Sequence, residues 1–227
     1  MEGKKAIISY KDVEIDIQAQ IILSEVNFEL QPGEFVYLTG KVGSGKSTFL
    51  KTIYGEADIR SGSAEVLGYN MKDIRQKDIP TLRRRLGIVF QDFQLLTDRT
   101  VYDNLRFVLR ATGWKNRNET DNRIREVLAQ VGMENKGYKM PNELSGGEQQ
   151  RIVIARAILN KPDIILADEP TGNLDVETGR KIVELLRDIC AQGSAIIMTT
   201  HNLNLLTEYP GKVYRCEGHR LSPAGNG

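Results

Sequence analysis

The most constraining feature of this chain is a glycine-rich loop that stands between an apolar run and a helical pattern. The run Glu34–Thr39 leads directly into the segment Gly40–Thr48 (GKVGSGKST), which fits the pattern G-x-x-x-x-G-K-[ST] in the strand–loop–helix context that this pattern requires. Gly43 and Gly45 allow the backbone to curl so that successive N–H groups point inward, where they can bind phosphate oxygens. The helix that begins near Ser47 adds the positive end of its dipole to the same anion.

Two side chains of this loop bring chemistry of their own. Lys46 supplies a positive charge to the β- and γ-phosphates of a nucleotide, and the hydroxyl of Ser47 can bind Mg²⁺. The segment therefore predicts a site for a nucleoside triphosphate with Mg²⁺, rather than a glycine turn with only a structural purpose. The residues that we expect to bind this ligand are Gly40, Gly43, Ser44, Gly45, Lys46, Ser47 and Thr48.

Three further apolar runs resemble Glu34–Thr39, because a polar residue ends or directly follows each of them. These runs are residues 86–90, 163–167 and 195–200. Continuous runs rich in β-branched residues indicate strands that are buried on both faces, as in a parallel sheet covered by helices. Ligands of open α/β sheets bind at the carboxyl ends of the strands. At those ends the sequence places Gln91, Asp168, Glu169 and His201.

The adjacent carboxylates Asp168 and Glu169 are expected to have separate tasks, because neighbouring residues of a strand point to opposite faces. We expect Asp168 to reach the Mg²⁺ shell beside Ser47, and Glu169 to act as general base for a water that attacks the γ-phosphate. Gln91 and His201 suit polar contacts with Mg²⁺, water and the γ-phosphate. Both are predicted in the catalytic group, and Gln91 also among the metal ligands. The simpler interpretation of the acidic pair is an Asp-Glu-Pro turn that caps the next helix.

The rest of the chain predicts an α/β fold with two additions to its core. Residues 7–30 alternate as antiparallel strands do, and Gly62–Gly68 looks like a further short strand. Residues 92–160 contain mostly helical patterns. We therefore predict a single domain, with the α/β core and an antiparallel β subdomain at residues 1–91 and 161–227, and an inserted α-helical subdomain at residues 92–160.

A second glycine-rich segment precedes a helical run inside the predicted insertion. In Leu144–Gln149 (LSGGEQ), Ser145 and Glu148 form a capping box, in which each side chain binds a free N–H of the first turn. The capping box does not explain Gly146 and Gly147, since glycine weakens the start of a helix. Bare glycines at a helix N-terminus allow close approach of an anion, and we expect this helix end to meet the γ-phosphate bound by another subunit.

Composition and charge exclude several classes of protein. The 227 residues include 31 lysines and arginines against 30 aspartates and glutamates, a net charge of +1 at pH 7. This balance argues against a general nucleic-acid binder, and the basic run Arg83–Arg85 is more simply a solvated face. Cys190 and Cys216 lack the spacing of a zinc site and indicate ordinary thiols in a reducing compartment. No apolar run suits a signal peptide or a membrane span, which predicts a cytoplasmic protein that another chain would have to hold at a membrane.

These motifs together resemble those of ABC-type ATPase domains. In chain order they are a Walker A loop at Gly40–Thr48, a Q-loop glutamine at Gln91, the ABC signature at Leu144–Gln149, Walker B with its catalytic glutamate at Ile164–Glu169, a D-loop at residues 173–175 and a switch histidine at His201. The resemblance spans nearly the whole chain, and the order and spacing of the motifs are highly specific.

The resemblance implies a P-loop NTPase (RecA-like) core and a head-to-tail homodimer that binds two ATP molecules with Mg²⁺. Each ATP would lie between Walker A of one subunit and the signature of the other. On this ground Ser145, Gly146, Gly147 and Asp175 are also expected to bind the nucleotide.

Two segments resemble one subgroup of these ATPases in particular. Ala167–Asp175 resembles the subgroup that contains FtsE, LolD and MacB, and Val89–Leu105 is more similar to the FtsE type, cell-division ATPases whose membrane partner is FtsX. This implies an FtsX-like transmembrane partner, a peripheral position on the inner face of the cell membrane, and transmission of force rather than transport. The alternatives are a LolD- or MacB-like export or lipoprotein-release ATPase and, from another class, a soluble ABC ATPase or a nucleotide-gated scaffold. No nucleic-acid partner is expected.

Two details stay open at this point. The family stacks adenine on an aromatic residue ahead of Walker A, whereas the corresponding residues here are Ile15–Ile17, so adenine is expected to rest on an aliphatic surface. Phe93, Leu95 and Leu96 follow Gln91, and they either line a groove for a helix of the membrane partner or belong to the core of the insertion.

Overall fold

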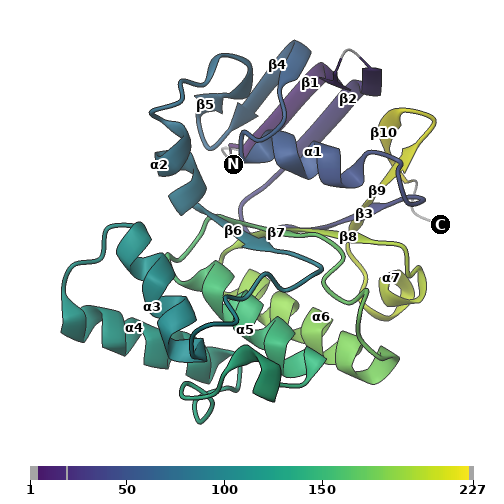
Figure 1. The fold of residues 1–227 in the computed structure, drawn as a ribbon. Helices are drawn as coiled ribbons and strands as arrows, with labels where there is room; N and C mark the ends of the chain where they lie inside the picture. The colour runs from purple at the N-terminus through teal and green to yellow at the C-terminus, as the bar shows by residue number, and fades with distance from the viewer. Residues whose placement is uncertain (1–4, 19, 225–227) are drawn as a thin grey trace.

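The computed structural model describes residues 5–18 and 20–224, and it contains two β-sheets with helices between and below them (Figure 1). A four-stranded sheet lies at the top of Figure 1, and helix α1 (Lys46–Ile53) lies beneath it. A six-stranded sheet crosses the middle of the molecule, and the other long helices lie below it.

The six-stranded sheet has the strand order β10-β9-β3-β8-β7-β6. Its strands are β3 (Phe35–Thr39), β6 (Leu86–Val89), β7 (Ile164–Ala167), β8 (Ala195–Thr200), β9 (Lys212–Glu217) and β10 (Arg220–Pro223). Neighbouring strands are parallel, except for the antiparallel pair β9 and β10. The carboxyl ends of the parallel strands therefore meet at one edge, where ligands of such sheets bind.

Strand β7 shows how the two faces of this sheet are used. Ile164 and Leu166 pack in a cluster with α1 and the antiparallel sheet, whereas Ile165 and Ala167 pack in a second cluster with the helices below. All four side chains are buried, which explains why the run is continuously apolar rather than alternating. The predicted parallel sheet with both faces covered is confirmed.

The four-stranded sheet is antiparallel and has the order β2-β1-β4-β5. Its strands are β1 (Ile8–Ile17), β2 (Gln20–Leu30), β4 (Ile59–Val66) and β5 (Tyr69–Asn70). One face packs on α1, where the rings of Tyr10 and Phe28 lie 5.5 and 5.0 Å from the ring of Phe49 in edge-to-face contacts. The predicted antiparallel subdomain is confirmed. Strand β4 begins earlier than predicted, because Gly62 lies inside it rather than at its start.

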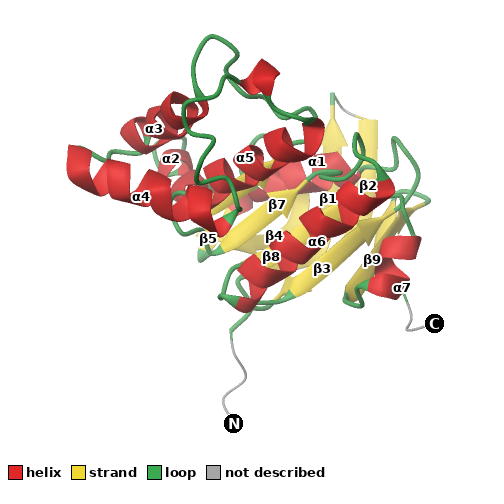
Figure 2. Ribbon diagram, turned by 90° about the horizontal axis from the view of Figure 1, so that it is seen from below, coloured by secondary structure: helices red, strands yellow, loops and turns green. Residues whose placement is uncertain are grey.

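The helices below the six-stranded sheet are α3 (Val101–Ala111), α4 (Arg117–Gln130), α5 (Gly146–Ile158) and α6 (Val176–Ala191). Shorter elements are α2 (Ile79–Arg84), α7 (Asn204–Glu208) and the 3₁₀ turns η1 (Met71–Asp73) and η2 (Pro141–Glu143). Figure 2 shows α6 lying along the strands, while α3 and α4 project to one side. Helix α5 packs against α3, α4, α6 and β6, so it joins the helical insertion to the core. Within the described ranges, no helix is both long and apolar enough to cross a bilayer.

The basic run Arg83–Arg85 binds groups of its own chain. Nε of Arg83 donates to the carbonyl oxygen of Tyr54 at the end of α1 (2.9 Å), and Nε of Arg85 donates to the carboxylate of Asp163 before β7 (2.8 Å). These two cations therefore tie α2 to its neighbours within the fold, instead of being only part of a solvated face.

Candidate functional site

The loop between β3 and α1 has a backbone that only glycine adopts easily. Gly40, Gly43 and Gly45 have φ angles of 146°, 78° and 103°. A β-carbon on Gly40 would lie 2.4 Å from the carbonyl oxygen of Cys216, so any other residue would displace β9. Helix α1 begins at Lys46, directly after the loop. The free N–H groups of its first turn therefore adjoin those of the loop.

The ammonium group of Lys46 is almost completely buried and lies across this loop. Its Nζ donates to the carbonyl oxygens of Gly40 (2.8 Å) and Lys41 (3.1 Å). It also lies 3.8 Å from Oε1 of Glu169. Lys46 thus connects the glycine loop with the carboxylate that follows β7.

Three hydroxyl groups belong to the same segment. Ser47 is exposed and Thr48 is half-buried, both in the first turn of α1. The hydroxyl of Ser44 is buried and has no hydrogen-bond partner among the described residues. A buried donor without a partner inside a glycine cradle fits an anion such as a nucleotide phosphate.

A threonine near the end of β8 connects the two acidic residues that follow β7. Oγ1 of Thr199 donates to Oδ1 of Asp168 (2.7 Å) and accepts from the backbone N–H of Glu169 (2.7 Å). Thr199 is fully buried. It was not among the predicted site residues, and the signal that points to it is the pair of threonines at the end of the otherwise apolar run 195–200.

The side chain of Glu169 is held between two other predicted site residues. Nδ1 of His201 lies 2.6 Å from Oε2 of Glu169, and Nζ of Lys46 faces Oε1. Since a carboxylate can only accept hydrogen bonds, a bond from the imidazole requires the tautomer of His201 that carries its proton on Nδ1. The backbone of Glu169 has a φ of 47°, a left-handed conformation that residues other than glycine seldom adopt.

Gln91 follows β6 and is exposed. Its backbone carbonyl oxygen accepts from Nδ2 of Asn173 (3.0 Å), and a β-carbon on Gly172 would lie 3.1 Å from its side-chain Nε2. Gln91 therefore adjoins the segment that follows β7.

The segment after Gln91 is anchored to α5. The guanidinium of Arg156 donates to the carbonyl oxygens of Phe93 (2.9 Å) and Gln94 (2.6 Å), both of which have left-handed backbones. Phe93 and Leu95 pack against the core cluster below the sheet, whereas Leu96 is exposed. Phe93 and Leu95 are thus partly buried against the core of the insertion, a position that suits either interpretation of this segment.

The second glycine-rich segment forms the N-terminus of α5. The backbone N–H of Ser145 donates to Glu148 (2.9 Å), the N–H of Glu148 donates to Oγ of Ser145 (3.3 Å), and the first of these bonds lowers the pKa of Glu148. A β-carbon on Gly147 would lie 2.5 Å from Cγ2 of Thr178 in α6. The packing of α5 against α6 therefore requires glycine at position 147, and the sequence did not reveal this requirement. Gly146 is less crowded.

Asp175 is the N-cap of α6. Its carboxylate accepts from the backbone N–H of Thr178 (3.0 Å), and hydrogen bonds from Thr178 lower the pKa of Asp175. Direct contacts within the chain thus bring together Lys46, Glu169 and His201, with Asp168 attached through Thr199. Asp175 and Gly147 instead both lie next to Thr178 in the first turn of α6.

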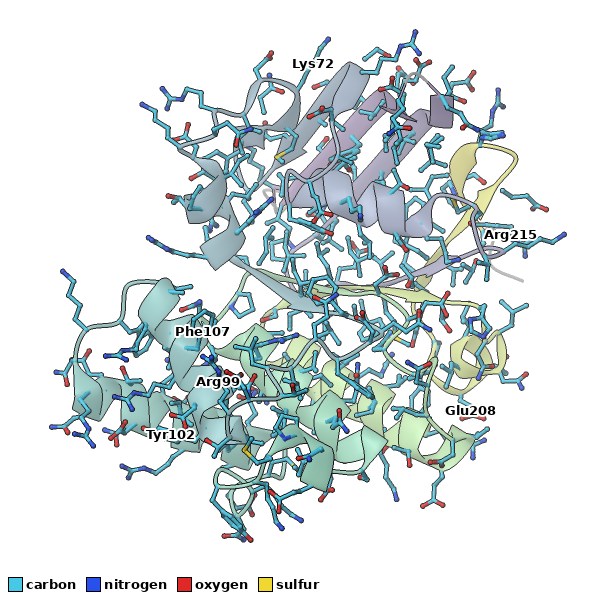
Figure 3. The ribbon with its side chains drawn as sticks, in the orientation of Figure 1. Lys72, Arg99, Tyr102, Phe107, Glu208 and Arg215 are labelled. Carbon is cyan, nitrogen blue, oxygen red and sulfur yellow. The ribbon has the colours of Figure 1, made fainter. Side chains whose placement is uncertain are left out.

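A cavity of about 570 Å³ adjoins the phosphate loop on the side of β9. It is lined by Thr39, Gly40, Lys41, Ser44, His201, Leu203, Arg215, Cys216, Glu217 and Gly218. Figure 3 shows the side chain of Arg215 pointing outward from this edge of the molecule. The predicted site residues of the loop and of β8 therefore border a hollow of the size that small ligands occupy.

Known proteins with similar sequences define the class of this one. Residues 23–172 match the model of the ABC transporter family, a range that includes the phosphate loop, the glycine segment and the acidic pair. The chain belongs to the ABC transporter family and is an ATPase of that family.

Its relatives include cell division ATP-binding proteins named FtsE. The chain is 47% identical over 199 residues to FtsE of Streptococcus pneumoniae D39, covering 88% of this chain and 86% of that protein. It is 43% identical over 204 residues to FtsE of Mycobacterium tuberculosis (89% and 88%) and 43% identical over 185 residues to FtsE of Escherichia coli K12 (82% and 83%). The predicted resemblance to FtsE is confirmed.

Solved structures agree with this family. A bacterial ABC transporter cassette in dimeric form has a TM-score of 0.82 at 33% identity, covering 94% of this chain and 96% of that one. The same cassette in a post-hydrolysis state bound to ADP and Pi also has a TM-score of 0.82, at 32% identity. CbiO1 of Clostridium perfringens has a TM-score of 0.88 at 27% identity, covering 95% and 86%. The predicted P-loop NTPase fold is confirmed.

Proposed function

We propose that this chain is the ATP-binding and ATP-hydrolysing subunit of a cell-division complex of the FtsE type. It dimerises around ATP and transmits the resulting conformational change to an FtsX-like transmembrane protein. The observation that carries the proposal is the position of Glu169, whose carboxylate contacts both Lys46 of the phosphate loop and His201. The FtsE relatives, at 41–47% identity, support the assignment to cell division.

The phosphate loop binds the β- and γ-phosphates of ATP. Backbone N–H groups of residues 40–48 and the N-terminus of α1 surround the anion. Lys46 adds a charge that now binds two carbonyl oxygens of the loop, and Ser44 adds a buried hydroxyl. These donors act on phosphate and not on the base, so they account for binding without the stacking aromatic that the family uses.

The donor set next to the loop fits Mg²⁺, which prefers oxygen ligands and shares them with phosphates. Ser47 supplies a hydroxyl, Asp168 a carboxylate and Gln91 an amide oxygen. Thr199 occupies Oδ1 of Asp168, which leaves Oδ2 for a cation. The phosphates of the nucleotide would complete the coordination. When bound, Mg²⁺ would neutralise charge on the phosphates.

Glu169 is the general base of hydrolysis. Its carboxylate accepts a proton from the water that attacks the γ-phosphate, while Nδ1 of His201 holds Oε2 in place (2.6 Å). The side-chain amide of Gln91 contacts the water or the γ-phosphate, while the backbone carbonyl of Gln91 is bound by Asn173.

Exposed aliphatic side chains around the site support a homodimer that closes on this face. Val42 at the tip of the phosphate loop, Val176 at the start of α6 and Leu203 after His201 are 91%, 63% and 59% exposed. A second copy that covers them would bury apolar surface and bring its own α5 N-terminus, with Ser145–Gly147, toward the γ-phosphate. The related cassette solved as a dimer supports this arrangement.

The FtsX-like partner docks beside α3, where two large apolar side chains are exposed. These are Leu96 and Phe107, and the guanidinium of Arg99 lies 5.3 Å from the ring centre of Phe107 (Figure 3). An apolar patch next to a cation suits an amphipathic segment of a membrane protein. Docking there would hold this protein on the inner face of the cell membrane.

Replacing Glu169 with glutamine tests the enzymatic part of the proposal. We expect ATP turnover to fall by about 100-fold or more, while ATP binding persists and a dimer accumulates with Mg²⁺-ATP in size-exclusion chromatography. Glu134→Gln, at an exposed position after α4, is the matched control. Unchanged turnover in Glu169→Gln would exclude Glu169 as the base, and a monomer in saturating ATP would contradict closure.

Leu96→Asp and Phe107→Asp test the partner surface. Both variants should bind ATP normally but lose co-purification with the membrane protein that accompanies the wild type. Tyr138→Asp, at an exposed aromatic outside this surface, is the control. Capture of an FtsX-like protein supports the cell-division complex, whereas capture of an export or lipoprotein-release permease would establish the LolD- or MacB-like alternative instead.

A further inference from the structure

Thr199 is the one buried side chain that contacts both acidic residues at the end of β7, among those that the structure describes. The strand pairing explains its position. Ala167 of β7 pairs with Met198 of β8, so the next residue of β8, Thr199, stands beside Asp168. We infer that Thr199 is a positioning residue for ATP hydrolysis, which fixes Asp168 and Glu169 relative to each other. The inference rests on the proposed catalytic task of Glu169.

The direction of the two hydrogen bonds is determined by chemistry. The hydroxyl of Thr199 has one proton to donate and can also accept. The backbone N–H of Glu169 can only donate, so it binds the oxygen of Thr199 (2.7 Å). The proton of Thr199 is then directed to Oδ1 of Asp168 (2.7 Å). A single hydroxyl thus connects the backbone of the proposed base with the carboxylate proposed to bind the cation.

The bond to the backbone of Glu169 has a specific consequence for its carboxylate. Glu169 has a left-handed backbone, which a residue with a β-carbon adopts only when its surroundings hold it there. Its N–H is held by Thr199, and its carbonyl oxygen accepts from the N–H of Gly172 (3.0 Å). These two bonds fix the peptide planes on either side of the α-carbon and so direct the side chain toward His201.

The alternative is that Thr199 only stabilises the fold, since the hydroxyl groups of buried threonines commonly bind backbone groups. Valine has nearly the same shape as threonine and lacks the hydroxyl, and serine keeps the hydroxyl and lacks the methyl group. The pair therefore separates hydrogen bonding from packing. Thr120, a buried threonine of α4 whose hydroxyl donates to the carbonyl oxygen of Asn116 (2.8 Å), is a matched control away from the site.

We expect Thr199→Val to lower kcat for ATP by about 30-fold to 100-fold, the scale of a base displaced by a fraction of an ångström, with KM for ATP within about twofold. Thr199→Ser should recover most of this loss, and Thr120→Val should show none. If Thr199→Val does not fold, Thr199→Ala allows the same comparison with serine. An unchanged kcat, a parallel rise of KM, or a serine variant as impaired as the valine variant would overturn the inference.

A double substitution separates positioning from general damage. If Thr199 acts by orienting Glu169, then Thr199→Val should cost nothing further in a Glu169→Gln background, because the base is already absent. If the fold-losses in kcat of the two single variants multiply in the double variant, Thr199 acts independently of Glu169 and the inference is overturned. Affinity for a fluorescent ATP analogue is measured in parallel and should match Glu169→Gln alone, whereas the thermal midpoint should fall by the same amount when Thr199→Val is added to either background, because two polar groups lose their partner. If Glu169→Gln itself turned over ATP normally, Glu169 would not be the base. That result would contradict the proposed function, whereas the results named above contradict only the positioning by Thr199.

Discussion

Glu169 and His201 lie 32 residues apart in the sequence, and Oε2 of Glu169 meets Nδ1 of His201 at 2.6 Å. The contact forms because β7 and β8 are adjacent parallel strands, so the residues that follow them leave the sheet at the same edge. The other oxygen of the carboxylate faces Lys46 at 3.8 Å. One side chain therefore links the phosphate loop with the ends of β7 and β8.

Replacing His201 with alanine should reduce ATP turnover by about 100-fold, because Glu169 loses the partner that orients its carboxylate. Nucleotide affinity should change little, since the loop and Lys46 are untouched. Steady-state turnover and titration with a fluorescent ATP analogue measure the two quantities. Gln130→Ala is the control, because Gln130 ends α4 and its amide donates to the side chain of Gln192, away from the site. Equal losses in both variants would contradict the prediction.

Replacing Gly147 with alanine should lower the thermal midpoint by about 3–8 °C, because the new β-carbon would lie 2.5 Å from Cγ2 of Thr178. Adding Thr178→Ser removes that methyl group and should restore the midpoint. If Gly147 also has to admit the γ-phosphate of a second subunit, turnover will stay low in the double variant. Full recovery of turnover together with stability would show that packing is the sole requirement for this glycine.

Replacing Arg123 with methionine should destabilise the fold by about 2–3 kcal/mol, measured by chemical denaturation. Arg123 is buried in α4, and its guanidinium donates to the carbonyl oxygens of Leu159 (2.8 Å) and Ile158 (2.6 Å) at the end of α5. Methionine fills the space but leaves these carbonyl groups without donors. Arg125→Met, on the exposed side of the same helix, should change stability by about 0.5 kcal/mol or less. A similar loss in both variants would argue against the buried contact.

Replacing Ile17 with tyrosine should tighten ATP binding by about threefold to tenfold, the equivalent of an aromatic stacking contact of about 0.5–1.5 kcal/mol. Ile17 is 44% exposed, whereas Ile15 is buried. The hairpin that carries Ile17 passes over the phosphate loop, since Ile22 and Leu23 approach Gly45. Ile17→Leu is the control and should leave the Kd unchanged. A tyrosine variant with unaltered Kd would mean that adenine lies elsewhere.

The two cysteines should react slowly with a thiol-specific disulfide reagent in the native protein. Burial raises the pKa of both Cys190 and Cys216, so at about pH 8 a smaller fraction of each thiol is ionised than in the unfolded chain. Sγ of Cys216 also donates to the carbonyl oxygen of Ser44 beneath the loop (2.8 Å). Denaturant should release both thiols together. A rapid phase in the native protein would contradict this expectation.

The phosphate loop and the strand-end residues could be predicted because their signals are local. The glycines of residues 40–45 follow an apolar run and precede a helix, and this order is sufficient to specify the turn and its free N–H groups. The continuous apolar runs likewise predicted strands buried on both faces, and a parallel sheet brings their carboxyl ends together. Asp168, Glu169 and His201 could therefore be assigned to one edge before any contact was known.

Other features depend on contacts between distant segments. The positions of Phe93 and Leu95 after Gln91 did not reveal their neighbours, and only the structure shows that both side chains lie partly buried against the core below the sheet. Arg83 and Arg85 looked like a solvated run, and their partners at the end of α1 and before β7 come from other parts of the chain.

The sequence by itself determined the kind of site, because glycine conformation, strand burial and the chemistry of single side chains are properties of short segments. Only the tertiary structure decided how those side chains are held. Strand register placed Thr199 beside Asp168 and Glu169, and the approach of α6 to α5 made Gly147 a packing requirement. Such contacts depend on which strands and helices become neighbours, and no short segment of sequence contains that information.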